Sequence, residues 1–567
     1  MSRKLTRRQF LAAGLASVGG IALAACGATP TATPVPATAT KPPAPAAATA
    51  TTAPVAPTAT KAPAAPTAVP PTAAVKRGGT ITVAINEDIS SPDPNRYTQG
   101  GDGQIMPLIA ECLVGGDAKD QVQPVLAEKW STADGGKTWI FTLRQGVKFH
   151  NGREMTSDDV KYSFDRVVDE KAALPLGGTL RNMGLRTTAV DKYTVKFELT
   201  KGFGSFLASQ LSNVRTVVIA KECVKADGTV DKPIGTGPWV YDSWQKGTEI
   251  RLKRFDSYWQ KGADGKSLPY LDAVVAKVVP DDTVRLSALR AKDVDLTPYV
   301  PFDDFKLWAS GKPVAGVNFK KLVVNSSYYF GLNPRRAPFQ DPLVRQAVKY
   351  AVDRNEINEA VFGGLGEVHN QPFRLSSFWY QQDVPYPQPD LNKAKDLMKQ
   401  AGLASGVDAV YSCWNTHQKY GEVIQAQLAR IGIRVKLEVA EYAAWWARGP
   451  KFDWDITMAP IGAIWHPERG FCTTESTYNA FWLSGGNIDP EIDGYMLEGR
   501  NEVDMVKAKA IYKKLVQKVE ANGTPIYMVN PAVAQAFRDY VKGYDPIDGS
   551  MASLPQQNGL AFTWLDK

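Results

Sequence analysis

Histidine is scarce in this chain, and the few present do not form a catalytic or metal-binding pattern. The four histidines, His150, His369, His417 and His466, lie far apart in the sequence, so a multi-histidine metal site is not expected. The sequence contains no G-x-S-x-G, H-E-x-x-H, C-x-x-C or G-x-x-x-x-G-K-S/T motif. These short patterns place a nucleophile, a metal or a nucleoside phosphate. We therefore predict a protein that is not an enzyme and that uses no cofactor and no metal.

Aromatic side chains are the other groups with binding chemistry. Their rings stack on sugars, on peptide side chains and on heteroaromatic molecules. Each ring could instead belong to a hydrophobic core, which remains an open alternative for every position. The candidates for a binding surface are Tyr97, Trp379, Trp414, Trp445, Trp446 and Trp465.

The helices and strands that carry these residues follow an N-terminal segment with the features of an export signal. Arg7 and Arg8 precede a Gly/Ala-rich apolar run, and small residues precede Cys26, as in a secretory signal. The paired arginines resemble a twin-arginine export signal, and the ending Leu-Ala-Ala-Cys resembles a bacterial lipobox. We predict a signal peptide at residues 1–25 and lipidation of Cys26, where two acyl chains would anchor the protein stably. The alternative is an ordinary signal with a chance cysteine.

Residues 27–75 contain only Gly, Ala, Thr, Pro, Val and Lys. A segment without aromatic or acidic residues has nothing to build a core, and scattered proline favours an extended, semi-rigid backbone. We predict that residues 26–76 form a lipidated cysteine followed by a disordered linker. At full extension, about 3.1 Å per residue, it could hold a domain up to ~150 Å from a membrane.

The positive charge of the chain belongs mostly to this leader. The whole sequence has a net charge of +8, but residues 1–76 hold seven basic and no acidic residues. That leaves 59 basic against 58 acidic residues for 77–567, a net charge of +1. The folded part therefore gives no support to nucleic-acid binding.

The remaining residues alternate between strand and helix patterns. Strands are predicted at residues 80–85, 139–143, 194–199 and 433–439. Helices are predicted from Thr156, which opens a capping-box pattern with Asp159, and at residues 341–352, 390–401 and 422–430. This mixture indicates an α/β protein, and a length of nearly five hundred residues indicates two or more lobes.

Several segments, in order, resemble the family 5 bacterial extracellular solute-binding proteins, the peptide- and nickel-binding group of ABC importers. The resemblance extends over most of residues 78–567, and each segment alone would be a weak signal. The segments are PVLAEKW (124–130), DGGKTW (134–139), LRQGVKFHNG (143–152), MTSDDVKYS (155–163), PIGTGPW (233–239), LPYLD (268–272), 341–354 with VRQA (344–347), and IGI (431–433).

The resemblance implies an α/β, two-lobe periplasmic-binding-protein clamshell of type II, with an extra subdomain in the first lobe as in the large family 5 architecture. It places a solute-binding domain at 77–567. The first lobe would comprise about 77–315 and 531–567, with an inserted subdomain at about 116–229. The second lobe would comprise about 316–530, and the ligand would lie between the two lobes.

The resemblance also implies which residues face the ligand. In peptide-binding relatives, a segment like Trp-x-Gly-Asp-x-x-Asp-Pro provides an aspartate for the free amine of the peptide. The corresponding stretch is 458–469, and it places Ala463 where that aspartate would be. Because a buried ammonium without a counter-charge is costly, His466 or Glu468 would have to substitute, or the ligand lacks a free amine. Trp465 lies in this stretch, and Glu87 follows the first strand at the expected cleft, where a solvated loop is an equally good explanation.

The four cysteines after the leader, at positions 112, 223, 413 and 472, allow three complete pairings. A disulfide of Cys413 with Cys472 is favoured, because both belong to the second lobe that the resemblance implies. Buried free thiols are the alternative.

We therefore expect an extracytoplasmic, lipid-anchored receptor, monomeric, that delivers an oligopeptide-type solute to the transmembrane subunits of an ABC permease. An oligosaccharide ligand is an alternative, motivated by the tryptophans and by Ala463. Further alternatives are a metal-chelate binder and a cell-envelope enzyme or adhesin that reuses the fold.

Overall fold

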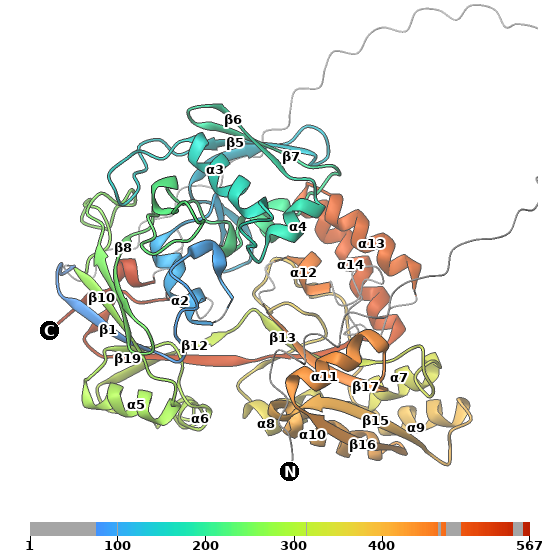
Figure 1. Cartoon of the computed structure of the whole chain (residues 1–567). Helices are drawn as coiled ribbons and strands as arrows, with labels where there is room; N and C mark the ends of the chain where they lie inside the picture. Colours follow the sequence, from blue (N-terminus) through green and yellow to red (C-terminus); the bar gives the residue numbers. More distant parts are fainter. Residues whose placement is uncertain are drawn as a thin grey trace, which may run out of the picture. The chain divides into compact units, whose positions relative to one another are not determined.

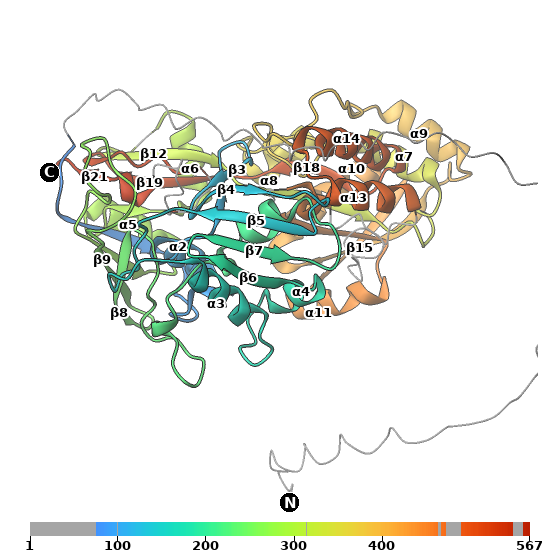
Figure 2. The same cartoon turned by 90° about the horizontal axis from the view of Figure 1, so that it is seen from above.

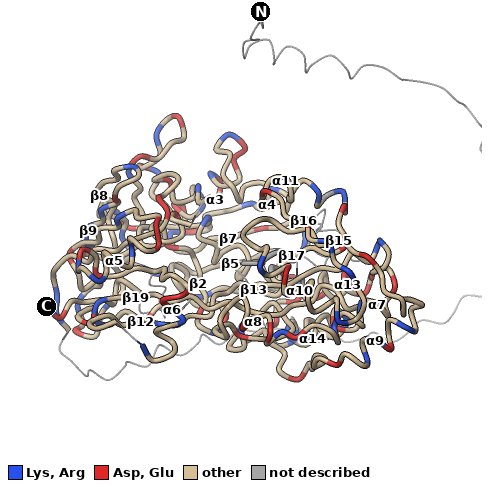
Figure 3. Tube along the Cα trace, turned by 90° about the horizontal axis from the view of Figure 1, so that it is seen from below, with Lys and Arg blue, Asp and Glu red and all other residues tan. Residues whose placement is uncertain are grey.

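The computed structural model describes residues 75–98, 100–312, 314–462, 466–471, 489–547, 551 and 559–567. All of them belong to one structural unit, residues 57–567. Within these ranges, no helix has the length and apolar character needed to cross a membrane. Lys and Arg are interspersed with Asp and Glu along the chain (Figure 3), in keeping with the balanced charge of residues 77–567.

A seven-stranded sheet organises what we call the first lobe, and its order is β12-β19-β11-β1-β10-β9-β8 (Figure 1). The predicted strand at residues 80–85 is confirmed as β1, whose Ile81, Val83 and Ile85 are fully buried. β1 runs parallel to β10 and β11. The strands are β1 (Thr80–Ile85), β8 (Trp239–Gln245), β9 (Glu249–Arg254), β10 (Ala273–Val278), β11 (Leu296–Thr297), β12 (Val317–Val323) and β19 (Ala532–Arg538). The helices beside them are α2 (Gly100–Ile109), α5 (Asp282–Ala291) and α6 (Phe302–Ala309).

A separate four-stranded antiparallel sheet, in the order β4-β5-β7-β6, follows β1 and α2 along the chain (Figure 2). We count the residues between α2 and β8, which include this sheet, with the first lobe. The expected capping box at the start of α3 is present, with the Asp159 carboxylate accepting from the Thr156 backbone N–H over 2.9 Å. The elements are β4 (Ala127–Ser131), β5 (Thr138–Leu143), β6 (Arg186–Asp191), β7 (Thr194–Glu198), α3 (Ser157–Val168) and α4 (Gly177–Asn182). A short hairpin of β2 (Val114–Gly116) and β3 (Val122–Pro124) precedes them, and a π-helical turn, η2 (Leu207–Leu211), comes after β7.

A six-stranded sheet, in the order β14-β18-β13-β17-β15-β16, organises the second lobe. β15 runs parallel to both β16 and β17. The strands are β13 (Ser326–Leu332), β14 (Glu367–Val368), β15 (Val407–Trp414), β16 (Ile433–Ala440), β17 (Ile456–Gly462) and β18 (Ile526–Asn530). The helices are α7 (Pro342–Ala351), α8 (Arg354–Phe362), α9 (Leu391–Gln400), α10 (Gln418–Ala429), α11 (Tyr442–Arg448), α12 (Pro467–Phe471), α13 (Pro490–Asn501) and α14 (Met505–Asn522).

The helix predictions in the second lobe hold, with one shifted boundary. Asp341 caps α7 by accepting from the Leu343 backbone N–H, and Pro342 is its first residue. Gly402, at φ +75°, follows the end of α9. α10 begins at Gln418, four residues before the predicted start, because a 3-10 turn at Asn415–His417 leads directly into it.

The chain passes between the two large sheets through two short connections. β12 continues into β13 through Val324 and Asn325, and β18 continues into β19 through Pro531. The Val324 N–H donates to the Pro531 carbonyl oxygen over 3.1 Å, so the connections lie side by side. Two adjacent connections of this kind are the usual arrangement for a hinge between lobes.

Candidate ligand-binding site

Parallel strands in each lobe end at an edge where ligands commonly bind. In open α/β sheets, this crevice lies beyond the carboxyl ends of the strands. In the second lobe, β15, β16 and β17 are parallel, and α11 follows the end of β16 directly. In the first lobe, β1 and β11 are parallel and end at Ile85 and Thr297. Most of the predicted ligand-binding residues are found at these two edges.

The second-lobe edge carries an aromatic cluster. The Trp414 ring lies 3.8 Å from the His417 ring and 4.3 Å from the Trp445 ring, measured between centroids. Tyr442 and Trp446, one helical turn apart on α11, stack with centroids 5.8 Å apart. The structure thus brings together Trp414, Trp445 and Trp446, three residues that the sequence suggested separately.

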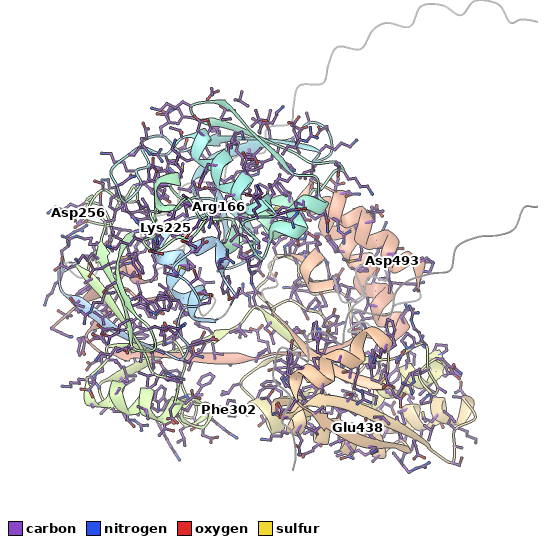
Figure 4. All side chains as sticks on the ribbon, in the orientation of Figure 1. Arg166, Lys225, Asp256, Phe302, Glu438 and Asp493 are labelled. Atoms are coloured by element: carbon purple, nitrogen blue, oxygen red, sulfur yellow. The ribbon has the colours of Figure 1, made fainter. Side chains whose placement is uncertain are left out.

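The members of this cluster differ in accessibility. Trp445 is buried, and its Nε1 donates to Thr457 Oγ1 over 3.2 Å, which supports the core alternative for this residue. Tyr442 and Trp446 are 52% and 37% exposed. Arg448 pairs with Glu438 of β16 over 2.8 Å and so ties the end of α11 to the sheet; Glu438 is labelled in Figure 4.

Tyr442 was not among the sequence candidates. The sequence could have identified it, because Tyr442 lies two residues after the end of β16 and four residues before Trp446. This spacing puts two rings on the same face of a helix.

Trp379 and His466 lie together in the core of the second lobe. Their ring centroids are 4.6 Å apart, and both rings also contact Tyr512. Burial lowers the pKa of His466 to about 3, so the imidazole is neutral at physiological pH. A neutral imidazole supplies no counter-charge for an ammonium group, and its Nδ1 already accepts from the Glu468 backbone N–H over 3.2 Å.

The first-lobe edge carries Glu87 and Tyr97. Glu87 Oε2 accepts from the Gly100 N–H, at the start of α2, over 2.8 Å. The Arg215 guanidinium lies 4.6 Å above the Tyr97 ring, and its Nε donates to the Tyr97 carbonyl oxygen. Burial raises the pKa of Tyr97, which keeps the hydroxyl protonated.

Glu468 belongs to neither of the two strand-edge clusters. Its carboxylate accepts from Ser205 Oγ of the first lobe over 2.7 Å. Trp465, Ala463, Cys26 and Cys472 lie outside the described residues. Cys413 lies buried in β15, and burial raises the pKa of its thiol to about 11. Its pairing with Cys472 stays a prediction. Among the described residues, no group of three or more His, Cys, Asp or Glu could hold a metal ion.

Two α/β lobes joined by two adjacent connections, with aromatic and polar side chains at the parallel-strand edges, define a two-lobe solute-binding protein. Residues 121–481 match the family described as "Bacterial extracellular solute-binding proteins, family 5 Middle". The chain therefore belongs to family 5 of the bacterial extracellular solute-binding proteins, and its fold is the two-lobe clamshell of that family.

The chain is similar to three proteins that are named for, or were solved with, different ligands. The dipeptide-binding protein of Escherichia coli (strain K12) is 29% identical over 496 residues, which cover 80% of this chain and 90% of that protein. The structure of DppA from Helicobacter pylori in complex with the peptide STSA has a TM-score of 0.68 and 25% identity, over 87% of this chain and 99% of that one. AgaA from A. tumefaciens R10, in complex with agropinic acid, has a TM-score of 0.67 and 26% identity, over 86% and 99%.

Proposed function

We propose that this chain is the substrate-binding component of an ABC importer, and that it captures an oligopeptide-type solute between its lobes for delivery to the permease. The observation that carries the proposal is the similarity to a dipeptide-binding protein over 90% of that protein's length, together with the peptide complex of the H. pylori relative. The receptor acts as a monomer and performs no chemistry on its solute.

We further propose that the solute of this receptor is not a simple dipeptide recognised by its free amine. The family resemblance implies an aspartate for the amine at the position where this sequence has Ala463, and the neighbouring His466 is neutral. The exposed pair of Tyr442 and Trp446 instead favours cargo with a flat or apolar group, which would stack on the rings. Such a group could be an aromatic or apolar peptide side chain.

An oligosaccharide is the second candidate ligand, because sugar rings stack on exposed tyrosine and tryptophan in the same way. The similarity to AgaA, whose structure holds agropinic acid, supports keeping a non-peptide ligand as an alternative. Both candidates predict that Tyr442 and Trp446 contact the solute.

The cargo can be identified directly. We expect mass spectrometry of solute extracted from the purified protein to detect short peptides, and isothermal titration calorimetry to measure their affinity. Replacing both Tyr442 and Trp446 by alanine should weaken binding by about 1–2 kcal/mol, roughly five- to thirtyfold. Leu497→Ala, an equally accessible apolar residue on α13, is the matched control and should leave the affinity unchanged. Recovery of sugars alone would refute the peptide cargo.

The N-terminus suggests how the receptor is kept near its permease. We propose twin-arginine export, lipidation of Cys26 and a linker at residues 27–76 that leaves the folded domain free to search for solute. Cys26→Ser should release the protein from membranes into the soluble fraction without changing solute affinity. A loss of affinity in this variant would show that anchor and receptor are not separate.

A further inference from the structure

The two lobes meet at a polar contact that involves Glu468. Ser205 Oγ, in the first lobe, donates to Glu468 Oε2 over 2.7 Å, and the Ser205 backbone N–H donates to the Arg500 carbonyl oxygen over 3.1 Å. Arg500 Nε lies 3.5 Å from the other Glu468 oxygen, and the guanidinium lies 6.0 Å from the centre of the Phe203 ring. The segment between β7 and η2 therefore touches both α12 and α13 of the second lobe.

The backbones at this contact approach so closely that only glycine fits. A Cβ atom added at Gly204 would lie 2.1 Å from the Glu502 carbonyl oxygen and 2.4 Å from its carbonyl carbon. Both obstructing atoms are backbone, so a side-chain rotation could not relieve the clash. An alanine at position 204 would force the two lobes apart at this point.

The contact is also of a kind that can open in water. The Glu468 and Arg500 side chains are 13% and 17% exposed, so water can reach their charges when they separate. The two crossover connections contribute no residue to it. Opening therefore breaks these polar contacts, while the two crossover connections act as the hinge.

Glu468 lies within residues 458–469, the segment that the family resemblance places at the ligand. It is the second residue of α12, which follows β17 after the undescribed residues 463–465. A shift of this segment on solute binding would move α12, and with it the carboxylate that Ser205 and Arg500 hold.

We propose that Phe203, Gly204 and Ser205 of the first lobe form a latch with Glu468 and Arg500 of the second, which closes on bound solute and opens for its release. The inference rests on the proposed function and sharpens it, because it makes Glu468 a positioning residue for lobe closure. The latch holds the lobes together beyond the contacts that the solute itself provides.

Gly204→Ala tests the latch, with Gly494→Ala as the matched control, since a Cβ at Gly494 on α13 meets nothing within 4 Å. Spin labels on p-acetylphenylalanine at positions 190 and 506, which are 56% and 73% exposed in the first and second lobe, would report the separation of the lobes in the full chain. The probe is a peptide digest of casein. We expect the digest to shift the wild type and Gly494→Ala to a short distance, and Gly204→Ala to keep a long one. Ser205→Ala should release bound peptide about tenfold faster, as for the loss of one charge-assisted hydrogen bond.

The possible outcomes distinguish a failure of the latch from a failure of the proposed peptide cargo. The latch would be refuted if the wild type and Gly204→Ala gave the same spin-label distances, both with and without the digest. If native mass spectrometry finds no peptide bound while Gly204→Ala still lengthens the distance, the peptide cargo is refuted and the latch is supported. Ser212→Ala, which removes a hydroxyl that donates to the Ala208 carbonyl oxygen of η2, should release peptide at the wild-type rate.

Discussion

Among the described residues, two of the polar contacts between the lobes differ greatly in character. Beside the crossover connections, Asp120 and Arg374 form an ion pair over 2.6 Å with side chains 0% and 4% exposed. Asn325, in the β12–β13 connection, also donates to Asp120 over 2.8 Å. The latch pair of Glu468 with Arg500 is longer and partly exposed. The Asp120 contact is sealed from water, whereas the latch pair is partly exposed at its edges, with Arg500 Nε itself buried.

This difference shows what each contact can do. Separating a fully buried ion pair leaves unpaired charges in a medium of low dielectric constant, which is strongly unfavourable. Separating a partly exposed pair costs little, because water replaces the partner. We infer that the Asp120 ion pair stays closed while the lobes move about it, and that the latch is the side that opens.

Arg374→Met gives the largest effect that this comparison predicts. It leaves the Asp120 carboxylate buried without its cation, and we expect the free energy of unfolding to fall by about 3–5 kcal/mol, measured by urea denaturation. The double variant with Asp120→Asn should recover most of the loss, since no buried charge then remains. A single variant as stable as the wild type would mean that the Asp120 ion pair is open to water.

Acid should lower the free energy of unfolding through two buried, neutral histidines, one near the crossover connections and one beside the latch. His369 contacts Asn530 near the crossover connections, and His466 lies beside the latch; burial lowers the pKa of each to about 3. A histidine with a folded-state pKa below its unfolded value of 6.5 contributes stability above pH 6.5 that is lost as pH falls.

Between pH 7 and pH 5, we expect each of these histidines to account for a loss of about 2 kcal/mol. His369→Gln and His466→Gln should each reduce the difference in unfolding free energy between these two pH values by that amount. Comparing each variant with itself at the two pH values removes any fixed cost of the substitution. An unchanged difference would contradict a neutral, buried imidazole.

Local patterns allowed much of the fold to be predicted. The helix from Pro342 was predictable because Val344, Ala347, Val348 and Ala351 repeat at helical spacing and are all buried in the structure. The two β-strands at residues 80–85 and 433–439 were predictable for the same reason, since apolar periodicity acts within a few residues.

The contacts between the lobes could not be predicted in this way. Asp120 and Arg374 are 254 residues apart in sequence, and Ser205 and Glu468 are 263 apart, so only the tertiary fold brings them together. The same limit applies to the tryptophans. The sequence made Trp379 and Trp446 equal candidates for ligand binding, but tertiary packing buries the first and leaves the second partly exposed.

Glu468→Gln gives the smallest predicted effect on stability and the sharpest contrast with Arg374→Met. The amide oxygen can still accept from Ser205 Oγ, while the attraction to Arg500 is lost from a partly exposed site. We expect urea denaturation to show a change below about 1 kcal/mol, whereas bound peptide should dissociate several times faster because the closed form is favoured less. A stability loss as large as that of Arg374→Met would place Glu468 in an interface that does not open, and the two contacts between the lobes would then be of one kind.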